Sequence, residues 1–251
     1  RYGRWVTDAM QGDFGESYRY EGTSVRSLLA QRLPVTVLLA VISLLIITVI
    51  SVPLGILSAR FAGKWVDTLT NCLTQILMAV PSFMILTYVF GLILHMFQPG
   101  KFIEPSENFG KSAQYLLFPA LAVALPKIAM VVKFLRSSIL TEMNREYVRT
   151  AYSRGNTETA VLYGHVLKNA MIPVVTFFAM VIAEILAGSI VAEQVFSVPG
   201  IGRLLISSIS NRDYPVVQAI VLYITSVVVL INFAVDMIYQ VLDPRVRTAE
   251  E

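Results

Sequence analysis

Long stretches of apolar residues constrain this chain more than any other feature of its sequence. A helix that crosses a bilayer needs about 20 mostly apolar residues. Five stretches reach that length with at most one charged residue each, namely residues 33–59, 68–94, 113–132, 170–192 and 214–235. Hydrophobic residues make up 55% of the 251 and charged residues only 15%, well below the charged share of soluble domains. The sequence therefore predicts an all-α, polytopic transmembrane bundle.

The distribution of basic residues between the spans predicts the orientation of the bundle. Lys and Arg gather in cytoplasmic loops. If the first 32 residues are left aside, one set of span ends carries ten of them, in residues 60–64, 133–169 and 245–247, and the other set carries four. This set should be cytoplasmic, with the C-terminus inside. Five spans then place residue 1 outside, although residues 1–32 contain no apolar stretch that would export them. We expect a missing first transmembrane helix before an external segment 1–32, and six spans in the full chain.

Several functional classes lack their characteristic residues. The single cysteine, Cys72, allows no internal disulfide, and two histidines make a metal site improbable. Gly110-Lys111-Ser112 ends like a phosphate-binding loop, but Pro105 stands where that motif needs a glycine. No serine-hydrolase or zinc-protease motif is found. We therefore expect no catalytic residue, no metal and no nucleotide site in this chain. The net charge of +3 is explained by membrane-flanking loops and does not indicate nucleic acid.

A few polar side chains within the spans are candidates for a transport pathway. They are Asn71, Gln75, Ser82, Glu184 and Ser189. Glu184 stands out, because a carboxylate near mid-membrane costs about 3 kcal/mol and usually faces a cavity or a partner. A structural pair with Lys127 and a role in the pathway both remain open. Because only Glu184 lies deep in its span, we expect Glu184→Gln to impair transport or assembly more than Glu193→Gln.

The longest loop, residues 133–169, has the pattern of a folded element. Apolar residues recur at helical spacing from Ile139 through Met143 and Tyr147 to Ala151. Gly155 interrupts this pattern, and Thr157 is placed to cap a second helix that contains Val161, Leu162, His165 and Leu167. The pattern predicts a helix, a bend at the glycine and a second helix on the cytoplasmic side.

The same loop resembles the EAA loop of binding-protein-dependent ABC importer permeases. Residues 146–155 read Glu-Tyr-Val-Arg-Thr-Ala-Tyr-Ser-Arg-Gly, with the glycine four positions after Ala151, as in that family. Arg149 and Thr150 depart from the first two EAA positions. Other segments resemble the oligopeptide, dipeptide and nickel branch in the same order, namely residues 12–17, 33–36, 81–83, 193–204, 212–215 and 243–247.

The resemblance implies the permease fold of type I ABC importers in residues 33–251, and a role in alternating access. The implied partners are a second homologous permease subunit, two cytoplasmic ATP-binding subunits and an external substrate-binding protein, in a bacterial or archaeal inner membrane. ATP and magnesium would bind to the partner subunits, and none would bind to this chain. The implied ATPase-coupling residues are Glu146, Tyr147, Arg149, Thr150, Ala151, Arg154 and Gly155. Peptides are the leading substrate, with nickel chelates or another small solute as the alternative. A hypothesis from a different functional class is an ATP-independent secondary transporter.

Overall fold

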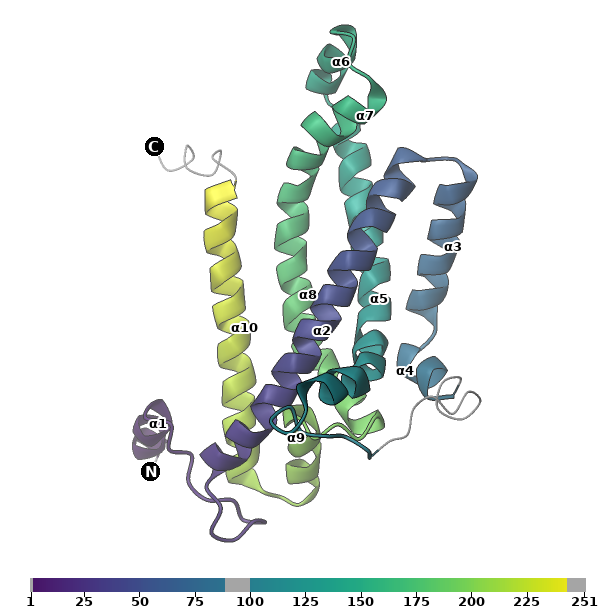
Figure 1. Ribbon diagram of the computed structural model, residues 1–251. Helices are drawn as coiled ribbons and strands as arrows, with labels where there is room; N and C mark the ends of the chain where they lie inside the picture. Colours follow the sequence, from purple (N-terminus) through teal and green to yellow (C-terminus); the bar gives the residue numbers. More distant parts are fainter. Residues whose placement is uncertain (1, 89–99, 243–251) are drawn as a thin grey trace. The chain divides into compact units, whose positions relative to one another are not determined.

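The computed structural model describes residues 2–88 and 100–242, and it is built from helices (Figure 1). In chain order they are α1 (Tyr2–Met10), α2 (Val25–Arg60), α3 (Trp65–Ala79), α4 (Ser82–Ile85), α5 (Phe109–Met143), α6 (Glu146–Ser153), α7 (Glu158–Val161), α8 (Leu167–Val195), α9 (Ile201–Ser210) and α10 (Tyr214–Leu242). Within these ranges the extended backbone forms no strand, only an isolated bridge between Glu16 and Ser24. The all-α prediction is confirmed.

Among the described residues, four helical segments are long and apolar enough to cross a membrane, and they contain four of the five predicted spans. The predicted span 68–94 is different, because α3 and the helix that follows it meet at an angle of 87°. Proline disfavours a helical conformation in the residue before it, and Val80, which precedes Pro81, has extended backbone angles. The predicted span is therefore bent at this point, and the two helices together can still form one broken span. Residues 89–94 lie outside the described residues.

Helix α2 begins eight residues before the predicted span. Its start is set by Ser24, whose hydroxyl accepts a hydrogen bond from the Ser27 amide at 3.3 Å, as an N-cap residue does. The first turns contain Arg26 and Arg32. The spans were predicted from uninterrupted runs of apolar residues, so these two charges excluded the start of α2 from the predicted span. The predicted external segment 1–32 thus contains α1 and the first two turns of α2.

The chain forms two compact units, and the long helices contribute residues to both. The first unit comprises Arg1–Ser43, Phe83–Val123 and Glu184–Leu230. Its apolar core packs the start of α2 against α9 and α10, through Val25, Leu28, Ile201, Leu204, Val216, Ala219 and Ile220. The fully buried Asp213 accepts hydrogen bonds from the Ser17 hydroxyl and the Tyr18 amide. These bonds hold the segment before α2 against the turn between α9 and α10.

The second unit comprises Leu44–Ser82, Ala124–Ala183 and the residues from Ile231 onward. Its core contains Ala59, Leu135, Ile139, Val148, Ala151, Val161, Leu162, Val166, Ala170 and Val174. This list joins the C-terminal parts of α2 and α5 to α6, α7 and the start of α8. Figure 1 shows α6 and α7 between the C-terminal end of α5 and the N-terminal end of α8. The predicted loop is therefore a packed part of this unit.

Candidate coupling site

The loop predicted over 133–169 is shorter in the structure because α5 continues to Met143 and α8 begins at Leu167. Ile139 and Met143 belong to α5, whereas Tyr147 and Ala151 belong to α6. The single helix expected through these residues is therefore broken into two. Arg145, the residue before α6, has extended backbone angles, so the chain changes direction at 144–145. The pattern continues across this break because both helices turn their apolar residues toward one core.

Helix α6 has a buried face and an exposed face. Val148 and Ala151 are buried among the core residues of the second unit. The predicted coupling residues Glu146, Arg149, Thr150 and Arg154 are exposed. Ala151 therefore holds α6 against the core of the second unit. The exposed charged residues of α6 and its C-terminal end are available to another molecule. An eight-residue helix is too short to be stable alone, so this packing is what holds the exposed charges in place.

Gly155 forms the bend between α6 and α7, as the sequence predicted. Its φ is +83°, in the left-handed region that glycine adopts without a steric penalty. The Asn156 side-chain amide donates to the Ala151 carbonyl at 3.0 Å, and the Thr157 hydroxyl accepts from the Ala160 amide at 3.3 Å. The predicted cap at Thr157 is thus confirmed. A π-helical turn, Leu162–Val166, then leads into α8.

Tyr147 connects α6 to α5 and α8. Its hydroxyl donates to the Glu142 carboxylate at 2.8 Å and accepts from the Asn169 side-chain amide at 3.1 Å. Partial burial of the Tyr147 ring raises the pKa of its phenol, and the Glu142 carboxylate raises that pKa further. The phenol therefore stays protonated at neutral pH and keeps its donor. Tyr147 thus has an anchoring position beside the exposed residues of α6.

A buried ion pair that was not predicted from the sequence joins α3 to α5. Asp67, at the start of α3, is 4% exposed. Its carboxylate accepts two hydrogen bonds from the Arg136 guanidinium on α5, at 2.6 and 2.7 Å. Bidentate geometry of this kind is strong and directional. Further donors to the same carboxylate are the Ser58 hydroxyl, the Gly63 amide and the Asn71 side chain.

The distribution of charges along the sequence did not predict this ion pair. Arg136 counted there as one more basic residue of a cytoplasmic loop, and Asp67 lay just outside the predicted span. The available signal was an acidic residue in the first turn of α3, where the helix dipole favours a negative charge. Nothing local identified Arg136 as its partner, because the two residues are 69 positions apart.

The predicted pathway residues divide between the two units. Asn71, Gln75 and Ser82 belong to the second unit, and Glu184 and Ser189 belong to the first. Asn71 binds Asp67, and Gln75 is exposed on α3. Ser82 and Ser189 are buried, whereas Glu184 is half-buried. Their common role in a pathway stays a prediction.

Glu193 is a carboxylate of α8 that the structure buries completely, with 0% exposure. It accepts from the Thr36 hydroxyl at 2.7 Å and from the Arg203 amide at 3.1 Å, while the Thr36 oxygen accepts from the Ile201 amide at 2.9 Å. Thr36 and Glu193 together cap α9, whose first amides lack partners within the helix. Burial inside the protein does not follow the predicted depth along the span, because Glu193 is the more enclosed of the two.

Comparison with known proteins identifies the family. Residues 51–248 match the family described as "Binding-protein-dependent transport system inner membrane component". The oligopeptide transport system permease protein AppB of Bacillus subtilis is 36% identical over 251 residues, covering 98% of this chain and 79% of that protein. A probable peptide ABC transporter permease protein of Sinorhizobium fredii, y4tP, is 34% identical over 246 residues, covering 97% and 78%.

A solved structure has the same fold. A chain of the MetNI methionine ABC transporter in an inward-facing conformation superposes with a TM-score of 0.65 at 18% identity, covering 86% of this chain and 96% of that one. The chain described here belongs to the family of binding-protein-dependent transport system inner membrane components. It is thus a multi-pass membrane component of a transport system, with the permease fold of ABC importers.

Proposed function

We propose that this chain is a permease subunit of an ATP-driven ABC importer and that it carries peptides across the inner membrane by alternating access. The observation that supports this most directly is its identity of more than 30% to named oligopeptide and peptide permeases along nearly its whole length. The exposed charged face of α6, held on a packed base, suits a docking contact with a soluble partner. The cytoplasmic side of the membrane is proposed for this loop and for the C-terminus.

The proposed complex contains a second homologous permease, two cytoplasmic ATP-binding subunits and an external substrate-binding protein. ATP and magnesium bind in the ATP-binding subunits, and this chain holds neither. Among the described residues, no three or more His, Cys, Asp or Glu side chains form a group that could hold a metal ion. Force from ATP hydrolysis then enters the membrane part through Glu146, Arg149, Thr150 and Arg154, while Tyr147, Ala151 and Gly155 keep α6 in position.

The experiment is purification of the tagged chain from its native membrane, followed by reconstitution into proteoliposomes. Two soluble ATP-binding subunits and a second permease should co-purify. Uptake of a labelled tripeptide should require the binding protein, ATP and magnesium, and a non-hydrolysable ATP analogue should block it. Uptake by this chain without any ATP-binding subunit would contradict the proposal and favour a secondary transporter. Import of a nickel chelate but not of peptide would support the ABC importer assembly and contradict the proposal that its substrate is a peptide.

A further inference from the structure

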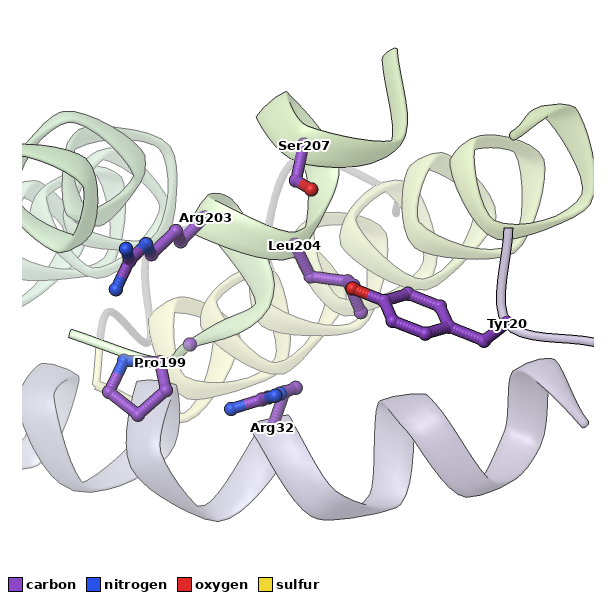
Figure 2. A pocket seen from close by; sticks show the side chains of 7 residues that line it. Tyr20, Arg32, Pro199, Arg203, Leu204 and Ser207 are labelled. Atoms are coloured by element: carbon purple, nitrogen blue, oxygen red, sulfur yellow. The ribbon is translucent and has the colours of Figure 1, made fainter. Parts of the chain in front are cut away.

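A pocket of about 230 Å³ in the first unit lies between α2, α9 and the segment before α2 (Figure 2). Arg32 of α2 and Tyr20 line it from one side, and Arg203 and Ser207 of α9 line it from the other, with Pro199 and Leu204 between them. Figure 2 shows the Tyr20 hydroxyl directed toward α9. The lining contains two guanidinium groups and no acidic side chain.

Neither guanidinium in the pocket has a negatively charged partner in the described part of the chain. Arg203 donates to the Ser197 carbonyl at 3.0 Å, which fixes its side chain but does not neutralise its charge. The Arg32 side chain makes no hydrogen bond or ion pair with any described residue. A third arginine, Arg19, donates to the Ser207 hydroxyl at 2.6 Å. Cations gathered in this way repel one another, and an anion between them would be stabilised.

The nearby carboxylates of the unit are already engaged elsewhere. Glu193 is fully buried and bound to Thr36 and the Arg203 amide. Asp213 is fully buried and bound to Ser17 and the Tyr18 amide. Neither side chain can reach into the pocket without leaving buried donors unpaired, which is costly. Neither of these two buried carboxylates therefore supplies a counter-charge to the pocket.

The donors in the pocket select the kind of anion. Phosphate groups are commonly bound by the free amides of a helix N-terminus, but α9 has the amides of Ile201 and Arg203 occupied by Thr36 and Glu193. An anion here meets only side-chain donors, and the planar guanidinium group matches a planar carboxylate. We propose that this pocket is a carboxylate-binding site in which Arg32 and Arg203 donate to the ligand, assisted by Tyr20 and Ser207.

The carboxylate has two possible sources, and both rest on the proposed importer function. One is an acidic side chain of the external binding protein, and the other is the free C-terminus of a peptide. The experiment measures the rate at which phenylglyoxal, a reagent for exposed guanidinium groups, modifies Arg32 in the purified complex, with mass spectrometry as the readout. The probes are trialanine, trialanine amide, the purified binding protein, and the same binding protein with its surface carboxylates converted to amides.

Protection of Arg32 that depends on a carboxylate is the expected result, with the rate lowered about tenfold when the probe is present at about nine times its dissociation constant. Protection by trialanine but not by its amide assigns the peptide terminus as the source. Protection by the binding protein that is lost after amidation assigns an acidic side chain. Equal rates with every carboxylate probe and its amide would overturn the proposal.

Variants separate a carboxylate site from a general effect of surface charge. Arg32→Gln should abolish the carboxylate-dependent protection of Arg203, and Arg32→Lys should retain part of it. The matched control is Arg212→Gln, an exposed arginine of the same unit outside the pocket, which should leave the protection of Arg32 unchanged. A complex that imports peptide but shows no such protection would contradict the carboxylate-binding site and leave the importer function standing. Protection by trialanine in a complex that imports nothing would refute the importer function alone.

Discussion

Gly155 adopts a backbone conformation in which a side chain is strained rather than crowded. Its φ is +83°, and nothing lies within 4 Å of the position that a Cβ would take. A residue with a Cβ in this conformation costs about 1–2 kcal/mol. We expect Gly155→Val to leave the chain inserted in the membrane but to shift α6. Substrate-stimulated ATP hydrolysis should then be uncoupled from uptake, or the ATP-binding subunits should dissociate, as measured in proteoliposomes and by co-purification.

Asparagine provides the matched control for this substitution because it tolerates positive φ better than other residues with a Cβ. Gly155→Asn should therefore retain most of the uptake that Gly155→Val loses. Glu146→Lys, which alters the exposed face and leaves the bend intact, should weaken coupling less than Gly155→Val. Normal uptake together with normal stimulated hydrolysis in the valine variant would show that force enters the chain elsewhere.

Glu193 and Thr36 form a buried cap on α9, and each atom of this cap has a defined partner. In Glu193→Gln the side-chain NH₂ replaces one oxygen and faces a donor, and an unpaired buried polar group costs about 1–3 kcal/mol. We expect Glu193→Gln to lower the melting temperature in detergent more than Glu184→Gln does, because Glu184 is only half-buried. This reverses, for stability, the ranking that depth along the span suggested.

Thr36→Val tests the same cap from the other side, since it removes the acceptor of the Ile201 amide and the donor to Glu193. Its melting temperature should fall in the same way. The effects of the two substitutions should not add in the double variant, because the residues share one network. A Glu193→Gln protein that melts like the unchanged chain would mean that the carboxylate contributes nothing to this cap.

At the scale of elements, the Asp67–Arg136 ion pair joins α3 to α5 beside the base of the coupling loop. Removing one partner of a buried pair leaves the other charge uncompensated. We expect Arg136→Met to destabilise the second unit by about 3 kcal/mol, at the lower end for buried pairs because the Arg136 side chain is 26% exposed. Thermal unfolding in detergent measures the loss, and uptake should fall together with stability.

An exposed ion pair in the same unit serves as the control. Arg145 lies 3.6 Å from Glu142, with 63% of its side chain exposed. Surface pairs of this kind contribute less than about 1 kcal/mol, so Arg145→Ala should hardly change the melting temperature. If Arg136→Met and Arg145→Ala had equal effects, the buried pair would have no special role in joining α3 to α5.

At the scale of the whole molecule, the orientation in the membrane is a prediction from the distribution of basic residues, and it is open to direct measurement. After Cys72→Ser removes the native thiol, single cysteines at positions 106, 157 and 211 provide probes, since Ser106, Thr157 and Asn211 are all exposed. In intact cells an impermeant thiol reagent should label positions 106 and 211 but not position 157. Labelling of position 157 from outside would invert the proposed topology.

The spans could be predicted from the sequence because membrane insertion depends on local composition. About 20 apolar residues are sufficient to cross a bilayer, wherever the rest of the chain lies. Capping is equally local, which is why Thr157 and the bend at Gly155 were predicted correctly. The start of α2 was missed because Arg26 and Arg32 interrupt the apolar run without interrupting the helix. The break at Val80 was missed because a proline near a span is tolerated in some membrane helices and bends others.

The sequence by itself determined the helical class, the number of apolar segments, the folded loop before α8 and the membership of a transport family. Only the tertiary structure decided which charges are buried and with what partners. Asp67 pairs with Arg136 across 69 positions of sequence, and Thr36 bonds to Glu193 across 157 positions. The physical reason is that such contacts arise from the packing of helices against one another, whereas periodicity and composition report only on residues within a few turns.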